Sequence, residues 1–485
     1  MRALIAGLLA FLLILSGVAR LLRPSRLPPG VTPLVWASSK NPYRYGQIDY
    51  FNATHPGLRL RLDGGNADFQ RIIVQTCSGV GPDVFDVLKG SYLQAYVEAG
   101  VAWDLTAAAA ADGIAADRDA WPAVHNEITY EGRQYGYPAG VGCFLILYNK
   151  NVFDRRGVPY PTDGMTWEEF LQRLTRVSGV LPDGSRIWGT NAVDYAGTAP
   201  AAFFWKAVFY SRHGEFFSPD GTRPTIDTPD LRVALQLHQD AIVRYRVLPR
   251  TVDVGAGTGQ GGWGNPATTQ FAEGHYATIV SGKFALASLR GFVEMQKRDL
   301  ARWEADPARQ RTEPRPEVLR LGVARLPHAS GRPFACVALS QTVVINPASP
   351  HRAQALAFLR FLASDAYAQR VESYGIPGNP RLARTDYPVT DPELAEHEIT
   401  RCEVESLRDG YQTRKSPFLL DFDVDRALDA QVARLEADPS LDCGRLLAEA
   451  QGELEAMLRL NLSRDPRLAA EYHRRIGAGA LTSNP

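Results

Sequence analysis

Residues 136–170, GYPAGVGCFLILYNKNVFDRRGVPYPTDGMTWEEF, constrain the fold most, because they place several structural signals in a fixed order. A segment rich in glycine leads into an apolar strand, and a polar exit leads into a short helix that Gly157 ends. A second helix begins at Thr166, which forms a capping-box pattern with Glu169. The stretch therefore predicts one buried strand followed closely by two helices.

The N-terminal part predicts a parallel sheet. Strands are expected at residues 34–37, 57–63 and 83–88, with helices at 45–54 and 68–76 between them. This alternation of strands and helices implies right-handed crossovers, and ligands then collect beyond the carboxyl ends of the strands. The polar residues that follow those ends are Ser38, Ser39, Lys40 and Asn41, then Asn66, then Lys89 and Ser91.

The remainder of the chain is expected to contain helices, strands and irregular segments. Residues 271–292 read as helix, strand, turn and helix, and residues 333–346 read as a strand. Residues 382–417 are expected to be irregular, and residues 423–475 to be helical. The tail at 477–485 is short and has no apolar pattern, so we expect it to be unstructured.

Length, charge and cysteine content exclude some classes of function. A chain of 485 residues favours more than one domain. Its 53 basic and 53 acidic residues cancel and form no long runs, which argues against nucleic acid as a partner. Five scattered cysteines indicate no metal site, and we expect Cys77, Cys143 and Cys336 to be small buried hydrophobic residues.

Residues 1–32 read as a signal peptide or a single membrane anchor. Residues 3–19 are apolar apart from Ser16, and Arg2 precedes them. Val18 stands where a lipoprotein would need its lipidated cysteine, so a lipoprotein is not expected. Export to the periplasm is the favoured interpretation, although the arginines after the apolar run leave an uncleaved anchor open.

Four segments together resemble one protein family. They are residues 81–87 (GPDVFDV), the stretch 137–150, residues 271–284 (FAEG through SGKF), and residues 344–362 (VINPASP through FLRFL). In order and spacing they resemble bacterial extracellular solute-binding proteins of the maltose-binding type, which serve ABC importers. The resemblance spans about residues 33–475.

The resemblance implies an α/β protein with the two-lobed periplasmic-binding-protein fold. Residues 33–140 and 340–380 would form the first lobe, and residues 141–339 and 381–476 the second. Crossings near Gly140 and Leu339 would act as hinges that let the lobes close on a ligand.

The resemblance also implies a set of ligand-binding positions. Phe284 stands where relatives carry a tryptophan that stacks on a sugar ring, and one of Phe204 and Trp205 stands near another stacking position. Gly142 replaces a carboxylate of the maltose binder, and Trp263 follows a glycine-rich loop and could close over a ligand. The full candidate set is Ser38, Ser39, Lys40, Asn41, Asn66, Lys89, Ser91, Gly142, Phe204, Trp205, Trp263 and Phe284.

Each of these positions also has a plainer interpretation. Phe284 and the 203–210 aromatics can be core residues, Lys40 and Lys89 can be solvated, and the loop at 255–264 can be a surface loop. The glycine run is not followed by a helix start, and neither 281–284 nor 397–401 completes a catalytic motif. An enzyme is therefore not expected, and no cofactor or metal is assigned.

We expect a monomer that binds a sugar or oligosaccharide and delivers it to ABC permease subunits. The departures from the family at Ser38 to Asn41 and at Gly142 argue against maltose itself. A membrane-anchored sensor or scaffold, and a binder of glycerol phosphate or another polar solute, remain as alternatives.

Overall fold

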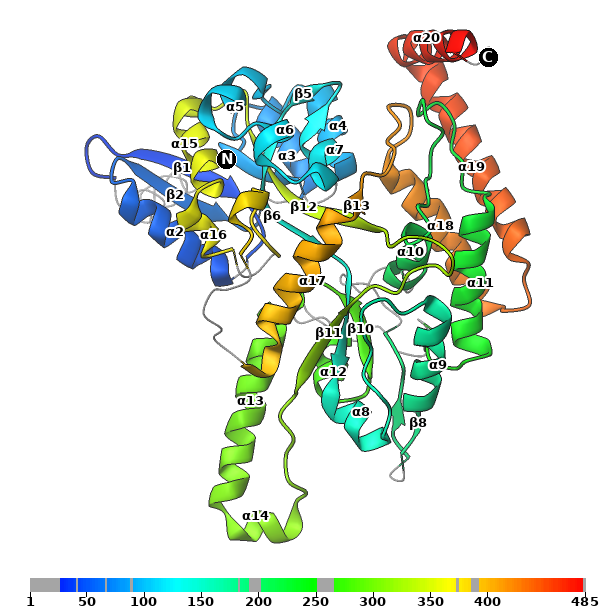
Figure 1. Cartoon of the computed structure of the whole chain (residues 1–485). Coiled ribbons are helices and arrows are strands. Elements are labelled where there is room, and N and C mark those ends of the chain that lie inside the picture. Colours follow the sequence, from blue (N-terminus) through cyan, green and yellow to red (C-terminus); the bar gives the residue numbers. More distant parts are fainter. Residues whose placement is uncertain are drawn as a thin grey trace, which may run out of the picture.

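The computed structural model describes residues 27–40, 42–65, 68–87, 90–181, 184–191, 202–250, 266–371, 375–384 and 392–482. Two sheets divide it into two lobes (Figure 1). The larger sheet has six strands and the smaller has three. Two short hairpins, β4 (Thr129–Tyr130) with β5 (Arg133–Gln134) and β8 (Gly179–Val180) with β9 (Arg186–Ile187), lie outside both sheets.

The first sheet has the order β13-β12-β3-β1-β2, with β6 also paired to β12. Strand β1 pairs in parallel with both β2 and β3, as the alternation of strands and helices predicted. Strand β12 runs antiparallel to β3 and to β6. Its strands are β1 (Thr32–Ala37), β2 (Leu58–Asp63), β3 (Val84–Val87), β6 (Gly136–Cys143), β12 (Cys336–Ile345) and β13 (Gly410–Tyr411).

Helices surround this sheet and bury its apolar side chains. Trp36, Phe51 and Phe358 form the centre of one cluster, and Phe85 with Tyr96 forms another. The helices are α2 (Pro42–Thr54), α3 (Phe69–Cys77), α4 (Gly90–Glu98), α5 (Thr106–Asp112), α6 (Ala116–Asp119), α7 (His125–Ile128), α15 (Arg352–Leu362) and α16 (Asp365–Ala368). Short 3₁₀ turns lie at Pro122–Val124 and Pro380–Leu382, and a third, at Pro392–Leu394, contacts α13 and β11.

The second sheet is antiparallel, in the order β10-β7-β11. Strand β6 ends at Cys143 in the first sheet, and β7 begins at Leu145 in the second, so one nearly continuous run of chain joins the two sheets. The strands of this sheet are β7 (Leu145–Asn149), β10 (Thr278–Ser281) and β11 (Leu321–Arg325). The assignment of individual residue ranges to each lobe remains a prediction.

The remaining helices, most of which the predicted boundaries assign to the second lobe, include the capped helix that the sequence predicted. Thr166 and Glu169 form a complete capping box, and Trp167, Phe170 and Leu174 are buried. The helices are α8 (Lys150–Arg156), α9 (Trp167–Val177), α10 (Ala202–Tyr210), α11 (Pro229–Val243), α12 (Pro266–Ala272), α13 (Leu286–Ala305), α14 (Pro307–Thr312), α17 (Glu396–Arg408), α18 (Asp421–Ala437), α19 (Cys443–Arg464) and α20 (Pro466–Thr482). A 3₁₀ turn, η3 (Lys283–Ala285), joins β10 to α13.

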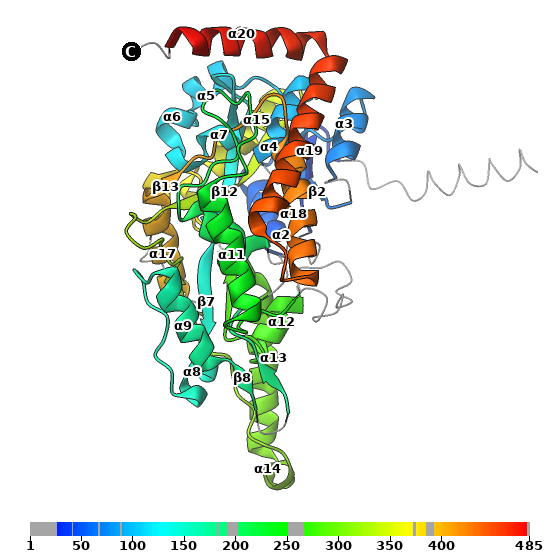
Figure 2. The same ribbon diagram turned by 90° about the vertical axis from the view of Figure 1, so that its right-hand side faces the viewer.

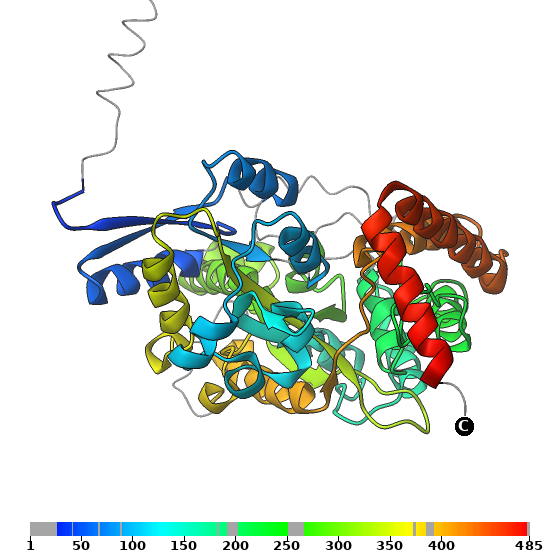
Figure 3. The same cartoon turned by 90° about the horizontal axis from the view of Figure 1, so that it is seen from above.

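Two groups of helices stand out from the body. Helices α13 and α14 form an arm that extends away from both sheets (Figure 2). Helices α18 and α19 pack against α11, and α20 continues from α19 at the edge of the molecule (Figure 3).

Two expectations about the C-terminal part were wrong. Residues 382–417 contain helix α17, which buries Ile399, Cys402 and Leu407, although buried charged residues such as Glu403 interrupt the apolar pattern. Residues 477–482 continue α20 where we expected an unstructured tail, since alanine and leucine favour a helix once it has started.

The five cysteines are free thiols. Cys143 and Cys336 are buried, as expected, but Cys77 is exposed at the end of α3, so that expectation was wrong. Within the described ranges, no helix is both long and apolar enough to cross a membrane. Residues 1–26 of the predicted signal peptide or anchor lie outside the described residues.

Candidate functional site

The candidate residues after β1 differ in their exposure. Ser38 is fully buried, and its hydroxyl donates a hydrogen bond to the carboxylate of Asp86. Ser39 is half-buried and Lys40 is exposed, with its side chain lying over Gly64 at the end of β2. The ends of β1 and β2 therefore meet, as the parallel register requires.

Several candidates lie outside the described residues. They are Asn41, Asn66, Lys89 and Trp263. Ser91 lies in the first turn of α4, where the backbone is described and the side chain is not. The prediction that these residues touch a ligand stays a prediction.

A group of buried polar side chains lies near the strand ends of the first lobe, and we call it the first-lobe polar cluster. It consists of Ser38, Arg44, Gln47, Asp86, Gln341 and Tyr367. Arg44 donates to Gln47 Oε1 at 2.7 Å, to Tyr367 Oη at 3.1 Å and to Gln341. Gln341 in turn donates to Asp86.

Asp86 is the acceptor at the centre of this cluster. It also accepts from Trp36 Nε1 at 2.7 Å, and the guanidinium of Arg44 lies over the Trp36 ring at 4.4 Å from its centroid. Burial raises the pKa of Asp86, and the charge of Arg44 with the three donors lowers it in part. Tyr367 donates to the carbonyl oxygen of Ala139 at 2.6 Å, so the cluster reaches strand β6.

Sequence reasoning missed Arg44, Asp86 and Gln341. The signal was available for Asp86, because it is a polar residue inside the otherwise apolar strand β3. Gln341 lies between Ser340 and Thr342 in β12, so no such contrast marked it. A polar side chain at such a position must find partners within the fold.

Gly142 is a buried backbone position. It pairs with Leu339 between β6 and β12. The segment that contains Gly375 lies directly over it, since a Cβ on Gly375 would come within 2.1 Å of the Val141 carbonyl oxygen and 3.1 Å of Gly142 Cα. In this structure Gly142 is thus covered by the chain itself.

Phe204 and Trp205 do not present a ring to the boundary between the lobes. Phe204 is 1% exposed and packs edge to face on Trp167 at 5.5 Å, while Trp205 is 0% exposed in the same core cluster. The expectation that one of them offers a stacking face is therefore corrected for this state of the molecule. Phe204, Trp205 and Phe209 of α10 lie in the second-lobe core, where burial of their rings stabilises the fold.

Phe284 is partly exposed, and its role as a stacking residue stays a prediction. It lies in the η3 turn after β10, is half-buried, and packs against the core of the second lobe with part of its ring exposed. Gly282 allows this close turn, because a Cβ there would come within 2.7 Å of the Phe284 ring.

Arg290 makes a hydrogen bond across the boundary between the lobes. This residue lies on α13 of the second lobe, and its Nη1 donates to Tyr43 Oη of α2 at 2.6 Å. Its Nη2 donates to Glu396 at 2.8 Å. The start of α2 and the N-terminal part of α13 therefore meet across the boundary.

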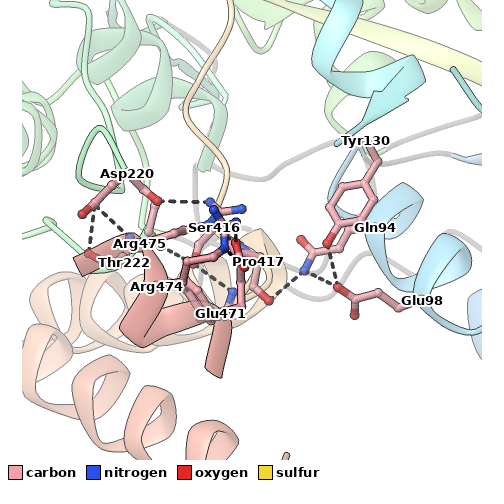
Figure 4. Close-up of polar contacts among 12 residues, drawn as sticks. Gln94, Glu98, Tyr130, Asp220, Thr222, Ser416, Pro417, Glu471, Arg474 and Arg475 are labelled. Atoms are coloured by element: carbon pink, nitrogen blue, oxygen red, sulfur yellow. Dashed lines mark hydrogen bonds and ion pairs between the residues drawn. The ribbon is translucent and has the colours of Figure 1, made fainter. Parts of the chain in front are cut away.

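A second contact crosses the boundary at α4 (Figure 4). Gln94 donates through Nε2 to the Pro417 carbonyl oxygen and to Glu98 Oε1, both at 2.9 Å. Tyr130 Oη donates to the same Glu98 oxygen at 2.9 Å. On the second-lobe side, Ser416 Oγ donates to the Gly221 carbonyl oxygen at 2.7 Å.

A cavity of about 240 Å³ lies beside this second contact. Both lobes contribute to its wall, and its lining mixes amide, hydroxyl and charged groups with leucine side chains. A hollow of about 400 Å³ at the start of α9 lies away from the boundary and contains none of the candidate residues. The cavity is lined by Leu93, Gln94, Asn126, Thr129, Tyr130, Glu131, Lys415, Ser416, Leu419, Leu420 and Asp421.

Comparison with known proteins extends these observations. The model of the family described as bacterial extracellular solute-binding protein matches residues 36–369. A protein of Brucella abortus (strain 2308), described as a binding protein, is 21% identical over 393 residues, which are 79% of this chain and 84% of that protein.

Solved structures share the two-lobed fold. An ABC substrate-binding protein from Listeria monocytogenes, in complex with cycloalternan, has a TM-score of 0.66 at 18% identity over 88% of this chain and 99% of its own. UgpB from Mycobacterium tuberculosis, in complex with glycerophosphocholine, has a TM-score of 0.67 at 16% identity over 89% of this chain and 100% of its own. At such identities the likeness shows the fold. Because the family model covers most of the chain, the protein belongs to the bacterial extracellular solute-binding proteins and works outside the cytoplasm.

Proposed function

We propose that this protein captures a sugar or oligosaccharide between its two lobes and hands it to an ABC-type importer in the membrane. The observation that carries the proposal is the hydrogen bond from Arg290 to Tyr43. This bond joins α13, which follows the Phe284 turn, to α2, which follows the polar residues after β1. An aromatic face and hydrogen-bonding groups are what a carbohydrate requires.

The solute class is supported by the neighbours in fold. One is solved with cycloalternan and another is described as a sugar-binding protein from Xanthomonas citri. The neighbour solved with glycerophosphocholine makes a glycerol phosphodiester the second candidate ligand. The protein acts as a monomer without catalysis, and residues 1–32 serve as a signal peptide or as an uncleaved anchor.

Thermal-shift screening tests the ligand class. A panel of mono- and oligosaccharides, with glycerol phosphodiesters included, should contain at least one compound that raises the melting temperature, because a ligand that binds only the folded form stabilises it. Mass spectrometry of the released compound should find it unchanged. A release of altered product, or no stabilisation by any carbohydrate or phosphodiester, would contradict the proposal.

The Phe284→Ala variant tests the site itself. Loss of the stacking face should weaken binding of the screened ligand about tenfold, equivalent to roughly 1.4 kcal/mol, with little change in melting temperature. Phe204→Ala is the matched control, since that ring lies in the core and its loss should lower the stability by roughly 3–5 kcal/mol. Equal losses of stability in both variants would place Phe284 in the core.

A further inference from the structure

A carboxyl group is buried directly beneath the turn that carries Phe284. Glu403 lies on α17 and is 0% exposed. Its neighbours on the same helix face, Ile399, Cys402 and Leu407, belong to an apolar cluster. A carboxyl group in such surroundings is unfavourable unless it has partners, so its contacts are informative.

Glu403 has one hydrogen-bond partner in the described part of the chain. Its Oε1 accepts a hydrogen bond from the backbone N–H of Lys283 at 3.2 Å. Its Oε2 has no hydrogen-bond partner among the described residues. Burial raises the pKa of Glu403 to about 7, while the charge and the N–H of Lys283 oppose that rise.

The turn above Glu403 has little freedom to move independently. A Cβ on Gly282 would approach the Phe284 ring to 2.7 Å and the Cys143 carbonyl oxygen to 2.9 Å. The backbone of Gly282 is therefore wedged between the Phe284 ring and strand β6. A shift of the Lys283 N–H would carry Phe284 with it.

Among the described residues, a small set of charged and titratable groups lies near Glu403. Lys283 faces it from η3 and Cys143 from β6, and Cys143 interacts in turn with Cys336 of β12. On the β11 side, Arg325 engages Ser406 at 3.2 Å and pairs with Asp409. Lys283 is thus the positive charge that acts on Glu403.

We propose that Glu403 is a positioning residue for ligand binding, whose carboxylate holds the Lys283 N–H and thereby sets the orientation of Phe284. This inference rests on the proposed function. The ionised carboxylate accepts a stronger hydrogen bond than the neutral acid. A turn that is held in place before binding loses less entropy on binding, so affinity is highest when Glu403 is ionised.

The first test needs no ligand. Hydrogen exchange of the Lys283 amide is measured at pH 6 and pH 8 and corrected for the intrinsic rate at each pH. In the unmodified protein, protection should fall about three- to tenfold at pH 6. In Glu403→Gln it should be the same at both values, because the amide oxygen of glutamine does not titrate.

The second test measures ligand affinity with the compound found by thermal-shift screening. The dissociation constant of the unmodified protein should rise about three- to tenfold from pH 8 to pH 6, and that of Glu403→Gln should stay constant. Glu405→Gln is the matched control, because Glu405 lies on the same helix, is partly exposed and pairs with Arg401. This control should retain the pH dependence.

The two tests separate the possible failures. Equal pH dependence in the unmodified protein and in Glu403→Gln, in either measurement, would overturn the positioning role. If no carbohydrate or phosphodiester binds, the proposed function fails, and the exchange of the Lys283 amide alone then decides whether Glu403 holds the turn.

Discussion

The two lobes bury carboxyl groups in different ways. In the first-lobe polar cluster, Asp86 accepts hydrogen bonds from Trp36, Ser38 and Gln341. In the second lobe, Glu403 accepts one bond, from the Lys283 N–H. Burial raises the pKa of both groups, so hydrogen bonding does not fully offset desolvation in either place.

The two carboxyl groups therefore differ in how firmly their surroundings hold them. A network in which each member has several partners rigidifies its surroundings, whereas a carboxyl with one partner can gain or lose its proton with less rearrangement. The first-lobe polar cluster should therefore determine stability, and Glu403 should determine how stability and binding respond to pH.

Arg44→Leu should produce the largest loss. Arg44 is 0% exposed and supplies the positive charge near Asp86, so its removal leaves the buried carboxyl group with hydrogen bonds but without a nearby opposite charge. We expect a loss of roughly 3–5 kcal/mol in the free energy of unfolding, measured by urea titration. Arg133→Leu is the control, since the Arg133 side chain is 65% exposed and should contribute less than about 1 kcal/mol. Similar losses of unfolding free energy in both variants would contradict the view that the first-lobe polar cluster determines stability.

Glu403→Gln should raise stability at pH 8 by roughly 2–3 kcal/mol. The pKa of Glu403 is 4.5 in the unfolded chain and about 7 in the folded protein. At a pH between these two values, Glu403 is ionised in the unfolded chain but still protonated in the folded protein. The contribution of Glu403 to stability therefore falls as pH rises through this window and is lowest above it. Thermal melts at pH 4 and pH 8 check the sign: the advantage of the variant should be present at pH 8 and absent at pH 4. A variant that is less stable at pH 8 would contradict the argument.

Trp36→Phe should have an intermediate effect. The change removes the 2.7 Å bond from Nε1 to Asp86 and alters the ring beneath Arg44, while the contact with Phe358 is largely kept. We expect a loss of about 2 kcal/mol in urea titration, because a buried charged acceptor loses one donor. Trp103→Phe serves for comparison, since Trp103 lies at the edge of the same core. An unchanged midpoint in Trp36→Phe would mean that water or another group replaces the donor.

Ser38→Ala should have the smallest effect and also tests the predicted site. Its hydroxyl is buried and donates to Asp86, so we expect a loss of about 1 kcal/mol in stability. Ligand affinity, measured by calorimetry, should change less than twofold if Ser38 acts only within the cluster. A loss of affinity with stability unchanged would instead support the direct ligand contact that the sequence predicted.

Much of the fold followed from local patterns. The alternation of Leu58, Leu60 and Leu62 with arginines predicted β2, and the capping box at Thr166 predicted the start of α9. Helix α17 escaped prediction because charged residues such as Glu403 lie on its buried face, so the apolar period was broken. A charged residue on that face can be recognised only when its partner on another element is known.

The candidate site was less predictable than the fold. The resemblance placed one of Phe204 and Trp205 near a stacking position but could not say whether that side chain meets the core or the boundary between the lobes, and both side chains lie in the core. Residues that the resemblance did not single out, Tyr43 and Arg290, join the lobes instead.

The sequence alone determined the order of strands and helices, the family and the chain segments at the strand ends, because periodicity, caps and turns are local properties. The tertiary structure decided which polar residues became partners, since Arg44 and Tyr367 are 323 residues apart and Lys283 and Glu403 are 120 apart. Burial and pairing depend on what the whole chain brings together, and these two properties set the stability and the chemistry of each carboxyl group.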